Sequence, residues 1–281
     1  MLHPYIPMEA SMEPLRILVL GAHPDDCDVH AGGLAVKYAR LGHQVRFVSL
    51  TNGDAGHYSQ GRAALAQRRQ AEAQEAAKVA GIDYLVLNNH DAELEATLEN
   101  RRKVTAIIRA FRPDLMLTHR PYDYHPDHRN TGILVQDSAY LVTVPNFCPL
   151  VPHLKDNPLI AYLSDHFARP VPFRADVVVD IDDAWEAKLD MLHCHRSQYY
   201  EWLPYNGGYL EDVPRDDVAR RKWLAERLRP YQAALAERFR AELNAAYGPE
   251  RGARVRYAEA FEVSEYGAPL SPEQRARIFP F

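Results

Sequence analysis

The sequence predicts an α/β fold, a three-layer sandwich with a mostly parallel, Rossmann-like sheet. Two observations support this prediction. Short apolar runs alternate with helical segments throughout the first half of the chain. These runs are bounded by small or polar residues, as buried parallel strands are. Such an alternation is typical of parallel strands joined by right-handed helical crossovers.

Each expected element has its own signal. The strands are apolar runs, expected at residues 16–22, 44–50, 84–87 and 114–118. Helices are expected at 28–41, 63–80 and 98–111, with a further one beginning near His128. The helix over 98–111 is amphipathic. Its predicted buried face consists of Leu98, Val104, Ile107, Ile108 and Phe111.

The second half is less regular, because prolines interrupt residues 145–158. A strand is expected at 177–180 and a helix at 183–192. A long helix from about Asp216 to Tyr247 should be kinked or split by Pro230. We expect one domain over residues 1–281. Its regular half, 1–143, would carry the functional site, and its irregular half, 144–281, would shape the substrate pocket.

Composition excludes several classes of protein. The net charge of −5, from 33 basic and 38 acidic residues, gives no reason to expect nucleic acid or an anionic membrane as a partner. No apolar stretch approaches the roughly 20 residues of a membrane span. The leader has no signal-peptide pattern, so we expect a cytoplasmic protein. The three cysteines form no CxxC pair, which argues against a disulfide framework or a thiolate zinc site.

Two clusters of histidine and aspartate carry the chemistry. His23-Pro24-Asp25-Asp26 follows the first expected strand, and His125-Pro126-Asp127-His128 follows the fourth. Because parallel strands end at the same edge of a sheet, both clusters should meet there. Either tetrapeptide alone could be an ordinary turn. Together they favour a catalytic divalent ion, since two imidazoles and a carboxylate form a recurrent zinc set with a position left for water.

The site supplies more groups than an ion needs. A spare carboxylate could act as general base, and a spare histidine as acid or oxyanion stabiliser. Zinc is the expected ion, one per chain, although iron suits the same donors.

At these motifs the sequence resembles the PIG-L/LmbE-type N-acetylglucosaminyl deacetylases, over most of the chain. The AHPDD block at 22–26 and the DYHPDH block at 123–128 form the specific pair. Weaker matches are TNGD at 51–54, Arg69-x-x-Glu72, Arg112-Pro113-Asp114, His195-x-Ser197-Gln198 and Glu259-Ala260-Phe261.

The resemblance implies a role for each matching residue. His23, Asp26 and His128 match the metal ligands, and Asp25 matches the general base. His125 matches the histidine that stabilises the oxyanion and can protonate the leaving amine. The sequence departs from the family at Asp28, where a glutamate is common.

Four further residues are expected to bind substrate or to support the site. Asp54 follows the second strand at the same edge, where Asn52 is the alternative. The resemblance adds Arg69 and Gln198, and Asp127 lies within the second cluster. The aromatic residues between 199 and 205 offer a stacking surface for a sugar, although such residues more often pack in a core.

The expected function is metal-dependent hydrolysis of an N-acyl amide on a small amino sugar, by a protein that could form a homo-oligomer. One alternative is an amide hydrolase for a non-sugar N-acyl or thiol-conjugate substrate. Another is a non-catalytic sugar- or metal-binding protein, which would be expected to lack Asp25 or His125. A dinucleotide-binding protein is excluded, because the first loop, GAHPDD, lacks the glycine-rich turn.

Overall fold

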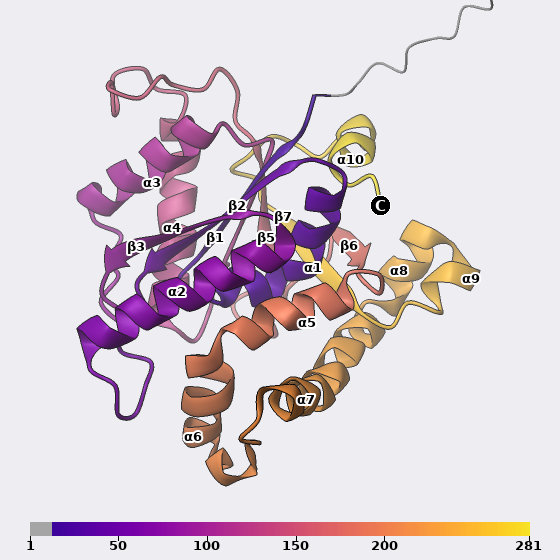
Figure 1. Ribbon diagram of the computed structural model, residues 1–281. Helices are drawn as coiled ribbons and strands as arrows, with labels where there is room; N and C mark the ends of the chain where they lie inside the picture. Colours follow the sequence, from indigo (N-terminus) through magenta and orange to yellow (C-terminus); the bar gives the residue numbers. More distant parts are fainter. Residues whose placement is uncertain (1–12) are drawn as a thin grey trace, which may run out of the picture.

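The computed structural model describes residues 13–281 (Figure 1). The leader in which a signal peptide was sought lies largely outside these residues. The described part contains a seven-stranded sheet in the order β3-β2-β1-β4-β5-β7-β6. Its strands are β1 Arg16–Gly21, β2 Gln44–Thr51, β3 Asp83–Asn89, β4 Leu115–Thr118, β5 Leu159–Leu163, β6 Val177–Asp180 and β7 Ala258–Val263.

The sheet is mostly parallel, which confirms the predicted fold class. Strands β3, β2, β1, β4 and β5 run parallel, and β7 pairs antiparallel with both β5 and β6. Strand β1 lies between β2 and β4, with Leu20 beside Val48 on one side and Thr118 on the other. The carboxyl ends of these three strands therefore lie next to one another.

Helices cover both faces of the sheet. The longer ones are α1 Asp26–Arg40, α2 Arg62–Ala80, α3 Leu98–Phe111, α4 Pro126–Leu141, α5 Trp185–Cys194, α7 Asp217–Arg238 and α8 Arg240–Tyr247. The shorter ones are α6 Leu203–Gly207, α9 Pro249–Gly252 and α10 Pro272–Ile278.

Alternate residues of β1 divide the core between the two faces. Ile17 and Val19 pack with residues of α1, α2 and α5. Leu18 and Leu20 pack with residues of α3 and α4 on the other face (Figure 1). Every side chain of the β1 interior is therefore buried, as the continuous apolar run predicted.

Several elements differ from the sequence expectation. Helices α1 and α4 begin at Asp26 and Pro126, a little earlier than expected. Strands β5 and β7 were not expected. Leu98, placed on the buried face of α3, is exposed. Helix α7 continues through Pro230, and the helical backbone breaks instead at Phe239.

None of the helices within residues 13–281 combines the length and the apolar character that a bilayer crossing requires.

Candidate metal centre and active site

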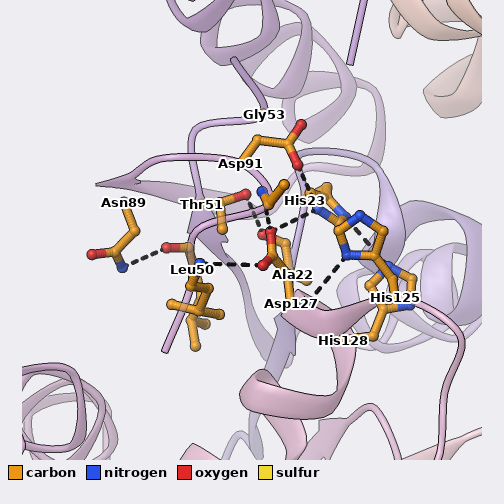
Figure 2. A network of polar contacts seen from close by, with 12 residues as sticks. Ala22, His23, Leu50, Thr51, Gly53, Asn89, Asp91, His125, Asp127 and His128 are labelled. Atoms are coloured by element: carbon orange, nitrogen blue, oxygen red, sulfur yellow. Dashed lines mark hydrogen bonds and ion pairs between the residues drawn. The ribbon is translucent and has the colours of Figure 1, made fainter. Parts of the chain in front are cut away.

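Loops from four neighbouring strands build the site at the carboxyl edge of the sheet (Figure 2). The loop after β1 supplies His23 and Asp26, and the segment after β4 supplies His128. The loops after β2 and β3 lie beside them. The Ala22 carbonyl ties the first two loops together, because it accepts hydrogen bonds from Thr51 N and Thr51 Oγ1, both at 2.8 Å.

The three residues matched to metal ligands converge. His23 Nδ1 lies 3.3 Å from His128 Nε2 and 3.4 Å from Asp26 Oδ2, and His128 Nε2 lies 3.5 Å from the same oxygen. Donor atoms bound to one tetrahedral ion at about 2.1 Å would lie about 3.4 Å apart. All three side chains are buried. The spacing and the donor types therefore fit a zinc-sized divalent cation.

Backbone N–H groups just before α1 hold the Asp26 carboxylate in place. Its Oδ2 accepts hydrogen bonds from Ala22 N at 2.9 Å and His23 N at 2.8 Å. Gly21 permits this approach, since a Cβ there would lie 2.8 Å from the Asp26 Cβ. Burial acts to raise the pKa of Asp26, but the charges of His128 and His119 outweigh it and hold the pKa well below its usual range. The carboxylate is therefore ionised and ready to bind a cation.

The other ring nitrogen of His23 faces two carboxylates (Figure 2). Nε2 lies 3.2 Å from Asp127 Oδ2 and 3.1 Å from Asp91 Oδ1. Fully buried Asp127 also accepts hydrogen bonds from the backbone N–H groups of Ala92 and Leu94. A carboxylate that accepts a hydrogen bond from Nε2–H leaves Nδ1 free to bind metal and fixes the orientation of the ring. Asp127 thus contacts His23 at Nε2, the ring nitrogen that does not face Asp26 and His128.

Several carboxylates lie around the imidazole of His23 and alter its pKa. Burial acts to lower the pKa of His23, but contacts with Asp127, Asp26 and Asp91 raise it well above its usual range. Burial would raise the pKa of Asp91, yet His23 and Arg69 lower it to about 2. Two carboxylates with lowered pKa values, Asp26 and Asp91, therefore lie beside His23.

Asp25, matched to the general base, directly precedes α1 and pairs with Arg69. Arg69 Nη2 donates to Asp25 Oδ1 at 3.0 Å, and Nη1 donates to the Gly53 carbonyl at 3.2 Å. Gly53 has a φ of +68°, and a Cβ there would lie 2.5 Å from Arg69 Nη1. Glycine suits this position for two reasons. It adopts the positive φ of the turn, and it has no Cβ to clash with the Arg69 guanidinium.

His125 begins α4 as its N-cap. Its Nδ1 accepts a hydrogen bond from Asp127 N at 3.2 Å, so the proton of the neutral ring must lie on Nε2. The His125 ring stands edge-on to that of His23, with centroids 4.6 Å apart. Burial, together with the charges of His23 and His128, lowers the pKa of His125. The result is a neutral imidazole beside the three converging donors.

Two other expected residues support loops. Asp54 accepts hydrogen bonds from Asp91 N at 3.0 Å and contacts His90 Nδ1 at 2.6 Å, so it shapes the loop after β3. Gln198 donates from Nε2 to the Gly56 carbonyl at 3.1 Å, which holds the loop after β2.

Three further residues lie at the site and were not predicted from the sequence, namely Asp91, His119 and Asp123. Asp91 contacts His23, His119 lies 3.2 Å from Asp26 Oδ2, and Asp123 Oδ1 lies 3.1 Å from His128 Nδ1. The same edge argument could have found the first two, because each follows a parallel strand by one or two residues.

Asp28, the position that departs from the family pattern, is fully buried against His195. Asp28 Oδ2 lies 3.3 Å from His195 Nε2, and both side chains have no exposed surface. The shorter side chain therefore still reaches a partner in the His195-x-Ser197-Gln198 motif.

The aromatic residues between 199 and 205 pack partly in the core and partly against Tyr58. Tyr199 and Tyr200 are buried in the core between α5 and α7. Tyr205 stacks on Tyr58, with centroids 4.3 Å apart, and Tyr58 stacks on His57 with its other face. Tyr205 and Tyr58 are nevertheless 51% and 41% exposed, so this stacked pair lies at the protein surface.

Comparison with known proteins agrees with this geometry. Residues 18–139 match the family described as PIG-L, GlcNAc-PI de-N-acetylase. The diacetylchitobiose deacetylase of Thermococcus kodakarensis is 33% identical over 68% of this chain and 74% of that protein. The 4-oxalmesaconate hydratase of Pseudomonas putida is 24% identical over 72% of this chain and 82% of that protein.

A solved structure is similar in fold as well. The N,N'-diacetylchitobiose deacetylase from Pyrococcus horikoshii aligns over 90% of this chain and 85% of that chain, with a TM-score of 0.69 and 28% identity. With the two motifs, their meeting at one sheet edge and these similarities, the chain belongs to the PIG-L family.

Proposed function

We propose that this protein is a zinc-dependent N-deacetylase that hydrolyses the N-acetyl group of a small amino sugar. One observation carries the proposal. His23 Nδ1, Asp26 Oδ2 and His128 Nε2 lie within 3.5 Å of one another, and His125 stands beside them. This arrangement matches the chemistry of a hydrolytic metal site, which needs a cation, a base and an oxyanion donor.

His23, Asp26 and His128 would hold the ion. When bound there, zinc would polarise the amide carbonyl and lower the pKa of water. The chain itself must hold the donors in a metal-binding orientation. Asp127 orients His23, and the backbone N–H groups of Ala22 and His23 orient Asp26.

Asp25 would act as general base on the attacking water. Its carboxylate is half-buried and oriented by Arg69, which itself is held by the Gly53 carbonyl. His125 would donate a hydrogen bond from Nε2 to the oxyanion that forms on the amide oxygen. A neutral donor suits this task, because its N-cap bond fixes the tautomer before the substrate arrives.

The proton balance closes without a further group. Water adds to the amide carbon and gives one proton to Asp25. The C–N bond then breaks, and Asp25 returns that proton to the departing nitrogen, which leaves as an amine. Neutral His125 keeps its Nε2 proton, because full transfer would leave an imidazolate. The second water proton stays on the new carboxyl group, so the products are acetic acid and the free amino sugar, which exchange that proton in solution to give acetate and an ammonium group.

The proposed substrate class is inferred from the names of similar proteins. A protein named diacetylchitobiose deacetylase is 33% identical, and another relative, 30% identical, is named as a probable N-acetylglucosaminyl malate deacetylase. These names favour an N-acetylglucosamine group over other N-acyl compounds. The cytoplasmic location, the single domain and the homo-oligomer stay predictions from sequence.

The decisive variant is Asp25→Asn, which keeps the size of the side chain and removes the base. Zinc content should stay near one per chain, while kcat for amine release from N-acetylglucosamine or N,N'-diacetylchitobiose should fall by about 10²–10⁴. Asp83→Asn, an exposed aspartate paired with Arg46, serves as the matched control. Loss of zinc from the Asp25 variant would mean that Asp25 is a ligand.

A substrate panel separates this proposal from its rivals. Amine release should be fastest from N-acetylglucosamine compounds and slower from N-acetyl amino acids or thiol conjugates. Zinc-loaded protein that releases no amine from any of them would overturn the proposal. Hydration of 4-oxalmesaconate would then point to the reaction named for the Pseudomonas relative.

A further inference from the structure

His119 is a buried histidine at the metal site to which the proposed mechanism assigns no task. It directly follows β4, and only 3% of its surface is exposed. Its position between two proposed ligands, Asp26 and His128, suggests a function that composition and motif could not reveal.

The imidazole of His119 contacts both of these ligands. Its Nε2 lies 3.2 Å from Asp26 Oδ2, the oxygen that the backbone N–H groups of Ala22 and His23 also reach. Its ring lies parallel to that of His128, with centroids 4.1 Å apart and an angle of 13° between the planes. One side chain thus restrains a carboxylate by a hydrogen bond and an imidazole by stacking.

Ring geometry argues against His119 as a ligand itself. Asp26, His119 and His128 also have donor atoms within 4.8 Å of one another, so distance alone would allow it. However, the lone pair of an imidazole nitrogen lies in the plane of its ring. An ion in the plane of His128 would lie well outside the parallel plane of His119. The two stacked rings therefore cannot both point at one ion.

We propose that His119 is a positioning residue that holds Asp26 and His128 in their metal-binding orientation. The proposal rests on the ligand set of the proposed function. In the neutral tautomer that carries its proton on Nε2, His119 donates to Asp26 Oδ2 at 3.2 Å, a shorter contact than the 3.3 Å between Nε2 and Ala22 N. Its ring covers one face of the His128 ring. Partners of this kind typically change metal affinity by about 10- to 100-fold when removed.

Two variants test the two contacts of His119 separately, namely the hydrogen bond to Asp26 and the stacking on His128. His119→Phe keeps an aromatic ring for stacking and removes the Nε2–H donor. His119→Gln keeps a side-chain N–H near the same place and removes the ring. The dissociation constant for Zn²⁺ alone is measured by competition with a chromophoric chelator. Each variant should bind Zn²⁺ about 10-fold more weakly, and His119→Ala, which lacks both contacts, about 100-fold more weakly.

Exposed His153, which lies beyond the far end of α4, provides a matched control. His153→Gln should bind Zn²⁺ as the wild type does. Co²⁺ substitution gives the second readout, because its visible absorption reports the number and type of ligands. At saturating Co²⁺, His119→Phe should retain the wild-type band positions and intensity.

The outcomes distinguish the possible failures. Unchanged Zn²⁺ affinity in both the Phe and Gln variants would overturn the positioning role. A changed Co²⁺ spectrum in His119→Phe would overturn it as well, by making His119 a ligand. Wild-type protein that binds no Zn²⁺ would instead overturn the proposed function on which this role depends.

Discussion

At the scale of single residues, Arg109 is a buried cation whose partners are backbone carbonyls. Only 2% of its surface is exposed, although it lies on α3 among apolar neighbours. Its guanidinium donates to carbonyls in the segment after α4, including those of Leu141 at 2.7 Å and Cys148 at 3.0 Å. The remaining acceptors are the carbonyls of Val142, Val144, Phe147 and Val151.

Arg109→Met should therefore destabilise the protein strongly. Methionine fills a similar space but leaves the Val142 carbonyl and several partly buried carbonyls without this donor. A buried group left unpaired costs about 1–3 kcal/mol. We expect a loss of about 3 kcal/mol or more, which lowers Tm by roughly 6–12 °C for a chain of this size. Thermal unfolding followed by circular dichroism measures this change. Arg102→Met, at an exposed position of the same helix, should leave Tm nearly unchanged.

Hydrophobic periodicity could not identify Arg109. The pattern of α3 correctly predicted Val104, Ile108 and Phe111 as buried, but it included Leu98, which is 48% exposed. A buried arginine is stabilised by partners from an irregular segment, and no local pattern encodes them. Asp91 differs from Arg109 in this respect, because it follows β3 at the edge that carries the site and the edge argument could have found it.

At the scale of elements, the start of α4 serves both the fold and the site. His125 caps the helix through Nδ1 and presents Nε2 toward His23 and His128. Pro126 suits the first helical position, where no N–H is needed. The histidine–proline–aspartate sequence is therefore a helix start, and it also carries groups that we propose for the site.

His125→Ser should separate these two roles. Serine is a good N-cap, so Tm should stay within about 2 °C of wild type. It cannot reach the oxyanion, so kcat should fall by about 10²–10³. His125→Ala should lose the same activity and, in addition, about 1 kcal/mol of stability. A serine variant with wild-type kcat would show that another group holds the oxyanion.

Helices α7 and α8 show where local rules fail at this scale. Pro230 was expected to kink or split the long helix, and the helix is not split there, because α7 continues to Arg238. The break comes at Phe239, whose φ of −110° and ψ of 28° leave the helical region. Phe239 is buried, and its ring packs against Phe173 at a centroid distance of 5.8 Å. The helix therefore ends at a residue that packs in the core and not at the proline.

At the scale of the whole molecule, the two halves of the chain were unequally predictable. The first half alternates strands and helices in order, so the parallel sheet and the edge that carries the site could be predicted. The second half supplies β5, β6 and β7 to the same sheet. Strand β7 pairs antiparallel with β5 across about a hundred residues of sequence, and no short-range pattern specifies such a pairing.

Removal of the metal should lower the stability of the whole molecule. Buried His23, Asp26 and His128 bring charged and polar donors within 3.5 Å, and a bound cation stabilises only the folded chain that assembles them. At free Zn²⁺ about 1,000 times the dissociation constant, linkage gives about 4 kcal/mol. Treatment with EDTA should therefore lower Tm by roughly 8–16 °C, and added Zn²⁺ should restore it. His128→Gln should unfold at the same temperature with or without EDTA. If the wild type behaves in that way too, the three donors do not hold a metal ion in the folded protein.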